Sequence, residues 1–459
     1  TIHSANNKKC PLLRSMNGKV TALSLMLCFG SIASACAFSP RWRRLRRPPL
    51  SLLRSSTTTD PDINSTHHDE LLWGMTRFFG EDMVDSKTRR FYYSCHPHLE
   101  ECKHVHFPIR DLAAAWDASK ALEFSDRILH KNVSKRVEII RVQRRLRDAI
   151  KCTLHWYQSA VKPTDSDVGI HLNEDTLLEP PTIGHSALLL LGICNSLRLS
   201  ILVQDEIPRD VVDRLVQGIL SMQMENGAFR IEFGKEEFLR GMEFFPGEAM
   251  LSLMSIYELS ATSCMPGILQ ESTKNAILPA MERAFRFYSN YYYTEDDVNT
   301  NFNIWQIQSF AKCHDSLGFD LTIKKKEEVR NYVIEMCLEI CDSRSWKYQL
   351  ARGQSFYINL ETVEIACGLD ALAEGIRIVL EQERDLLPDN DAKLFKMKMQ
   401  AINALYFLEW SQGQVPDGVV VGKGGLGYGG TEVFEQRLDV TGHAISALVK
   451  LRNLFVLLP

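Results

Sequence analysis

Apolar and amphipathic segments alternate along most of the chain. Five segments are apolar on nearly every side of a helix, and each has polar or aromatic residues near its start: 184–193, 245–259, 303–313, 359–372 and 442–451. A helix of this kind has to be buried on most sides. The segments between them, such as 134–160, are charged on one face and apolar at helical spacing on the other. The pattern predicts inner helices around a central cavity, backed by outer helices.

Helix signals continue from residue 109 to the end, and we predict one all-α domain over residues 109–459. The expected helices span 109–129, 134–160, 184–203, 208–224, 246–260, 271–292, 303–316, 324–341, 359–375, 391–411 and 439–456. One more short helix is expected within 69–90, in a polar lead-in that covers 60–108. The long loops at 160–183, 225–245, 342–358 and 412–438 mix glycine, aromatics and β-formers. Such loops predict short β-hairpins at one end of the domain.

Residues 1–59 have the features of a targeting presequence. A secretory signal begins at Met16, with Lys19, an apolar run over 20–29 and small residues over 34–37. Phe38 and the acid-free, Arg- and Ser-rich sequence after it resemble the junction of bipartite plastid presequences in algae. We expect plastid localisation through the secretory pathway, with secretion or the ER lumen as the alternative. No membrane span is expected in the mature protein.

Charge separates this presequence from the rest of the chain. Ten of the 53 Lys and Arg residues lie in residues 1–59, together with none of the 57 acids. The remainder carries 43 basic and 57 acidic side chains, a net charge near −14. An acidic chain without a basic stripe does not suit a nucleic-acid partner. We expect a small molecule or a glycan as the ligand instead.

Cysteines and histidines cluster at one place, between Cys95 and His106. Nine cysteines follow the presequence, an odd number, and most lie singly within apolar helical patterns. We therefore expect a largely reduced protein and no disulfide framework. His104 and His106 would share one face of a strand, where two imidazoles can bind a metal. The spacing matches no zinc template, so we expect a His-rich loop, with no metal and no cofactor.

The alternation of inner and outer helices resembles the α/α-toroid superfamily. This superfamily contains six-hairpin glycosidases, lyases and epimerases, and also terpenoid cyclases and protein prenyltransferases. The segment 223–229, QMENGAF, is similar to a Gln–x3–Gly–x–aromatic turn of the cyclases. The segment 247–259 resembles inner helices of the glycosidase-like members, and 442–451 resembles a helical segment of glucuronyl epimerases. The resemblance implies an all-α fold, the α/α toroid. The DxDD and paired DDxxD motifs of terpenoid chemistry are missing.

Such toroids bind ligands over the N-terminal ends of their inner helices, which implies a set of site residues here. The catalytic candidates are Glu248, Asp439, His443 and His185. The substrate-binding candidates are Trp305, Glu361, Asn301, Arg437, Tyr428 and Glu243. Carboxylates in apolar surroundings have raised pKa values, which suits acid catalysis. The alternative for Glu248, Asp439 and both histidines is a plain helix-capping or core role.

Three functions remain open at this point. The first is a carbohydrate-active enzyme, which needs two carboxyl groups or a base with a neutralising cation. The second is a terpenoid-cyclase or prenyltransferase-like enzyme on an isoprenoid, which needs a continuous aromatic wall with one acid. The third is a non-catalytic toroid that binds a glycan or a protein. The lining of the cavity discriminates among them.

Overall fold

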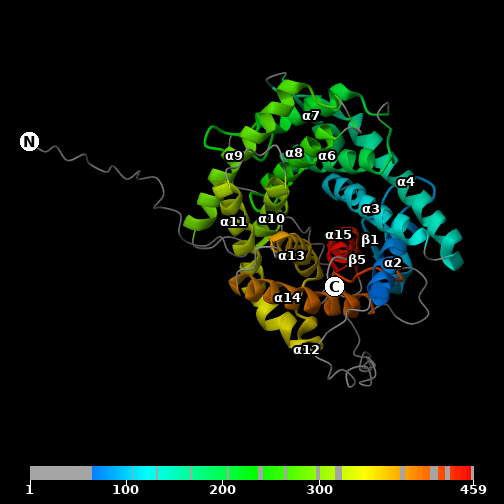
Figure 1. Ribbon diagram of the computed structural model, residues 1–459. Helices are drawn as coiled ribbons and strands as arrows, with labels where there is room; N and C mark the ends of the chain where they lie inside the picture. Colours follow the sequence, from blue (N-terminus) through cyan, green and yellow to red (C-terminus); the bar gives the residue numbers. More distant parts are fainter. Residues whose placement is uncertain are drawn as a thin grey trace, which may run out of the picture. The chain divides into compact units, whose positions relative to one another are not determined.

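Six of the described helices pack side by side in a closed circuit. They are α3 (Pro108–Leu129), α6 (Ile183–Arg198), α8 (Phe245–Ala261), α10 (Thr300–Asp315), α13 (Thr362–Gln382) and α15 (Leu438–Phe455). Each packs against the next in this order, and α15 returns to α3 (Figure 1). Five of them match the five apolar segments of the sequence. The sixth, α3, was not among the predicted inner helices, because its many alanines are interrupted by charged residues that the circuit buries.

The remaining long helices pack outside this circuit. They are α2 (Ser65–Glu81), α4 (Arg136–Gln158), α7 (Arg209–Ser221), α9 (Glu271–Thr294), α11 (Ile323–Asp342) and α14 (Pro388–Gln412). Along the chain they alternate with the inner helices, and each packs against an inner neighbour. Since α2 packs on α15, α3 and α4, the lead-in before residue 109 contributes a helix to the compact unit, which begins at residue 63.

The computed structural model describes residues 65–455, apart from 106, 131–132, 166–167, 204–205, 236–240, 263–264, 266, 296–299, 316–322, 383–387, 414–421 and 429–434. The expected presequence, residues 1–59, lies outside the described residues. Within them, the chain is predominantly α-helical with small antiparallel sheets. Every predicted long helix is present. No helix in this part of the chain is both long and apolar enough to span a membrane.

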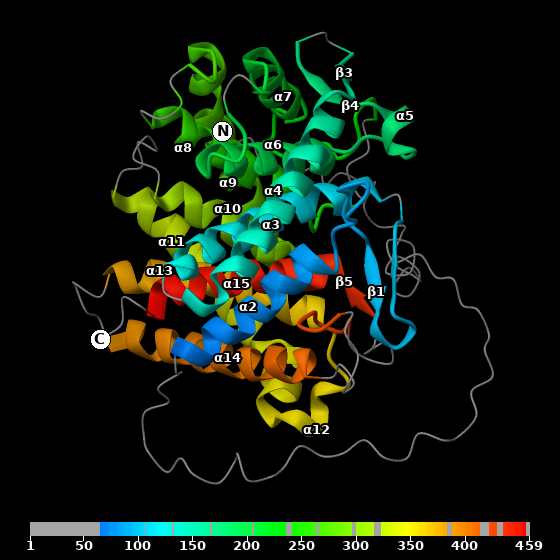
Figure 2. The same cartoon turned by 90° about the vertical axis from the view of Figure 1, so that its right-hand side faces the viewer.

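Two small sheets lie along one side of the helices (Figure 2). The first has the order β2 (Glu101–Lys103), β1 (Ser94–His96), β5 (Gln436–Arg437), and all its pairs are antiparallel. In it, Ser94 pairs with both Lys103 and Arg437. The second joins β3 (Val161–Pro163) to β4 (Ile170–Leu172). Because β5 leads directly into α15, the first sheet fixes the N-terminal end of that inner helix.

The loop at 342–358 differs from the predicted hairpin, because it is helical. It forms a π-helical turn (Arg344–Gln349), a 3-10 turn (Leu350–Arg352) and α12 (Gln354–Tyr357). Trp346 is fully buried and lies against Gly368, where an added Cβ would come within 2.6 Å of the indole. Burial of this indole holds the loop in helical turns. Other short turns are η3 (Pro97–Leu99), η4 (Val133–Lys135) and α5 (Glu174–Leu177).

Cys95 and Cys102 form a disulfide, which the expectation of a largely reduced protein without a disulfide framework did not include. The two residues face each other across β1 and β2, a pairing that the sequence did not reveal. The six other described cysteines, from Cys152 to Cys367, are free, as predicted for buried helical positions. The disulfide also removes both thiolates from any metal site in the segment. His104 contacts Phe91 O and Asp85 Oδ2, at 3.2 Å each, and His106 lies outside the described residues.

Glycines allow the inner helices to approach closely. At Gly247 in α8, an added Cβ would overlap Trp305 of α10, whose main-chain carbon lies 3.0 Å away. The carbonyl of Gly247 also accepts a hydrogen bond from Ser309 Oγ at 2.7 Å. The contact therefore involves main-chain atoms on both helices, and side-chain rotation cannot relieve it.

Gly247→Ala is expected to lower the free energy of unfolding by about 1–3 kcal/mol, the usual cost of overpacking. Chemical denaturation measures the change. Gly413→Ala is the matched control, because a Cβ there meets its nearest atoms at an ordinary 3.5 Å. Equal stability of the two variants would contradict the close packing of α8 on α10.

Candidate functional site

Three inner helices, α3, α13 and α15, carry charged or titratable side chains, and ion pairs join the three helices. Such residues recur every three, four or seven positions, which is the spacing of one helix face. They are Arg110, Asp117 and Lys120 on α3, Asp370, Glu374 and Arg377 on α13, and Asp439, His443 and Lys450 on α15. Charged residues are rarely buried unless they are paired. The interior of the circuit is therefore a polar column along three helices.

Asp439 lies at the N-terminal end of this column, between two guanidinium groups. Its Oδ2 is 3.1 Å from Arg110 Nη1 and 2.9 Å from Arg437 Nη2. Burial alone would raise the pKa of Asp439, but Arg110 and Arg437 together lower it below its ordinary value. The Arg437 guanidinium also lies over the rings of Tyr428 and Tyr93, at 4.4 and 5.2 Å. Asp439 is thus a fixed, ionised carboxylate.

Glu248 is a second buried carboxyl group, on the first turn of α8. Gly184 of α6 leaves room for it, since a Cβ there would lie 2.7 Å from Glu248 Oε2. Burial raises the pKa of Glu248 to about 8, against an opposing effect of Arg110. Its Oε2 has no hydrogen-bond partner among the described residues. Glu248 therefore holds a proton at neutral pH, whereas Asp439 does not.

Asp117 and Asp370 continue the column deeper in the interior. Asp117 packs where Gly442 of α15 meets α3, and neither of its oxygens is hydrogen-bonded within the described chain. Burial, followed by repulsion from Asp370 and Asp439, raises the pKa of Asp117 well above its usual range. Asp370 instead forms an ion pair with Lys450, whose Nζ lies 2.9 Å from Asp370 Oδ1. Buried polar atoms without partners usually contact water or a ligand.

Aromatic rings border this column. Trp305 of α10 lies between Trp116 and His443, with ring centroids 6.0 Å apart in both pairs. Burial lowers the pKa of His443, although Asp370 and Asp439 oppose the effect. The imidazole is therefore neutral at physiological pH. Flat apolar faces beside carboxyl groups are suited to sugar rings.

A pocket of about 710 Å³ lies toward the C-terminal ends of the inner helices. All six contribute to its lining, including Trp116, Lys120, Arg198, Glu258, Lys312 and Lys450. The sequence placed the ligand site over the opposite, N-terminal ends. Trp116 and Lys450 connect the two regions, because Trp116 packs on Trp305 and Lys450 pairs with Asp370.

The structure brings together six of the ten predicted site residues. They are Glu248, Trp305, Tyr428, Arg437, Asp439 and His443. His185 belongs to a cap instead, because its ring contacts Thr182 and, at 3.0 Å, Glu179 Oε1.

The other three predicted residues are Glu361, Asn301 and Glu243. Glu361 is exposed, and Asn301 is half-buried at the start of α10. Glu243 is half-buried and acts electrostatically on Tyr291 of the outer helix α9.

Sequence reasoning missed Arg110, Asp117, Asp370 and Lys450. A signal was present in α3, where Arg110 and Asp117 are seven residues apart in an alanine-rich stretch. When two charged residues lie on a helix face that otherwise carries small apolar side chains, that face is expected to meet other charged groups. Identifying them required the partners on α13 and α15, which no local pattern supplies.

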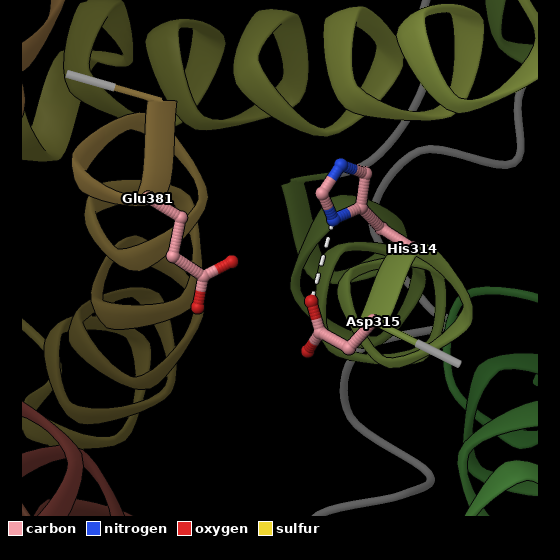
Figure 3. A group of neighbouring side chains, drawn as sticks. All are labelled: His314, Asp315 and Glu381. Carbon is pink, nitrogen blue, oxygen red and sulfur yellow. Dashed lines mark hydrogen bonds and ion pairs between the residues drawn. The ribbon is translucent and has the colours of Figure 1, made fainter. Parts of the chain in front are cut away.

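His314, Asp315 and Glu381 form the most metal-like group among the described residues (Figure 3). Asp315 and Glu381 come from α10 and α13, and His314 Nδ1 lies 3.3 Å from Asp315 Oδ1. Arg377 already pairs with both acids, at 2.7 and 2.9 Å. A guanidinium between two acids repels a metal cation, so this group does not indicate a metal site.

Comparison with models of known protein families gave no match, and comparison with curated protein sequences gave none either. The residues and their geometry are therefore the basis for a functional assignment.

Proposed function

We propose that residues 63–459 form an α/α toroid and that this toroid is a carbohydrate-active enzyme. The toroid is supported by the alternation of inner and outer helices along the chain and by the contact of α15 with α3. The enzymatic proposal rests on one observation. Glu248 and Asp439, two buried carboxyl groups from different inner helices, have opposite ionisation around the shared Arg110.

Glycoside chemistry uses such a pair, in which one carboxyl is held protonated and the other ionised. Glu248 would donate its proton to the leaving oxygen of the glycosidic bond. Asp439 would act as the carboxylate partner, either by activating water or by attacking the anomeric carbon. Arg110 and Arg437 keep Asp439 ionised before the reaction, so that it can accept the proton of the water or bond to the anomeric carbon. In a lyase or an epimerase the same groups would supply a base, an acid and a neutralising cation.

The other predicted residues have supporting roles in this proposal. Trp305 offers a flat face to a sugar ring, and neutral His443 lies beside it as a hydrogen-bonding group. Tyr428 holds the guanidinium of Arg437 in place. The unpartnered oxygen of Gln306, which is buried on α10, is a further acceptor for a sugar hydroxyl.

Two alternatives have weaker support. An isoprenoid enzyme needs a continuous aromatic wall, but Trp116 is the one aromatic residue among the described residues that line the 710 Å³ pocket, and aliphatic, polar and charged side chains make up the rest. A non-catalytic toroid predicts that the carboxyl groups only cap helices or pair on the surface. Glu248 is 6% exposed, and its Oε2 is unpartnered among the described residues.

Glu248→Gln is expected to reduce turnover by about 10²–10⁴-fold, because glutamine cannot donate the proton. Reducing-end release from a panel of glycans measures the activity, and the same panel scored for unsaturated or epimerised products covers the other two reactions. Glu271→Gln, an exposed acid in the first turn of α9, is the control and should retain activity. No activity of the unmodified protein on any glycan, or an unaffected Glu248→Gln variant, would contradict the proposal.

The raised pKa of Glu248 also predicts how stability depends on pH. Between its ordinary value of 4.5 and about 8, the folded protein holds a proton that the unfolded chain releases. The stabilising contribution is thus complete below about pH 4.5 and is lost as the pH rises toward 8, at about 1.4 kcal/mol per pH unit. Urea denaturation measures the free energy of unfolding between pH 5 and 8. This free energy should fall less steeply with pH in Glu248→Gln than in the unmodified protein. Parallel curves would mean that Glu248 is ionised.

We also propose that the protein enters an oxidising compartment on its way to the plastid. The Cys95–Cys102 disulfide supports this route, because such bonds form and persist in the secretory pathway rather than in the cytosol. Mass mapping of protein from its native cell, after thiol blocking and without reductant, should recover the two cysteines in linked peptides. Blocked thiols at both positions would contradict the oxidising route.

A further inference from the structure

The charged groups of the C-terminal pocket are paired, with one exception. Lys312 pairs with Glu258 at 2.6 Å, and Arg198 pairs with Glu123 at 3.0 Å. Lys450 contacts both Asp370 and Glu374 at 2.9 Å. Arg377 contacts three acids, Asp315, Glu374 and Glu381, at 2.7–3.0 Å. Each of these four cations therefore has a carboxylate counter-charge.

Lys120 is the exception. It lines the pocket from the middle of α3, and its amine forms no hydrogen bond or ion pair within the described residues. A cation without a partner in a partly enclosed space is unfavourable unless something else supplies the opposite charge. The acid that acts on Lys120 electrostatically is Glu123, which forms its own ion pair with Arg198 at 3.0 Å.

We propose that this pocket binds a small organic anion, whose carboxylate or phosphate group pairs with Lys120. A volume of about 710 Å³ matches the usual size of small-molecule sites. Trp116, Leu191 and Leu251 supply apolar surface for the body of the ligand, while Asn195, Ser255 and Gln308 supply hydrogen-bonding groups. The site is distinct from Glu248 and Asp439, so it does not depend on the proposed reaction.

The ionisation of Lys120 makes the binding pH-dependent. Burial, followed by the nearby Arg198, lowers the pKa of Lys120 to about 8. A bound anion would favour the charged amine, so anion affinity should fall as the pH rises above about 8. The other charged groups around the pocket are Glu123, Arg198, Glu258, Lys312, Asp315, Glu374, Arg377 and Lys450. All of them are in ion pairs.

Calorimetric binding of glucuronate and glucose 6-phosphate to the full chain, with glucose as the neutral probe, tests the inference. At pH 7 at least one of the two anions should bind more tightly than glucose. Lys120→Met should lower the affinity for that anion at least about tenfold and leave the affinity for glucose unchanged. Lys120→Arg should retain the affinity and lose the decline above pH 8, because arginine stays charged. Lys393→Met, an exposed lysine on α14, is the matched control and should bind normally.

The ratio of the two anion affinities identifies the group recognised, carboxylate or phosphate. Glu248→Gln should bind the anion like the unmodified protein even if it lacks activity, which separates this site from the proposed catalytic pair. Equal binding of both anions and glucose would overturn the inference. Unchanged anion affinity in Lys120→Met, or loss of binding in a folded Lys120→Arg variant, would also overturn it.

Discussion

The ion pair between Arg110 and Asp439 closes the circuit of inner helices. It joins the first inner helix to the last, and both residues are at the N-terminal ends of their helices. An isolated buried carboxylate would be costly, so Asp439 depends on its two guanidinium partners. Arg437, the last residue of β5, is fixed by the sheet and by two tyrosine rings. The sheet, the two helices and the charge pair thus support one another.

The other buried charges follow from that pair. Arg110 opposes the ionisation penalty at Glu248, while the negative charge of Asp439 makes ionisation of Asp117 still less favourable. Further along the column, Lys450 neutralises Asp370 and Glu374. Protonation of Asp117 and Glu248 therefore reduces the repulsion that the ionised carboxylates would otherwise exert in the same enclosed space. Such a division of ionisation states is what acid–base chemistry requires.

The architecture explains how the interior can contain so many polar groups. Apolar contacts between inner and outer helices form the hydrophobic core, with side chains such as Phe310, Tyr332 and Phe407 fully buried. Glycines at the helix contacts allow the inner helices to pack closely and leave room for Glu248 and Asp117. The stability of the fold is therefore supplied mainly outside the circuit, and the inner faces are available for charged residues.

The sequence by itself determined the long helices and identified five of the six inner ones. Local spacing of apolar residues is enough for this, since a uniformly apolar helix such as α6 has to be buried. It also indicated Glu248, Asp439 and His443, because polar residues at the start of apolar helices stand out. Only the tertiary structure decided that His185 is a cap, that α3 is inner, and that Cys95 and Cys102 are bonded. Arg110, Asp117 and Lys120 acquire their chemistry from partners, or from missing partners, on distant helices, and no pattern within one segment encodes that proximity.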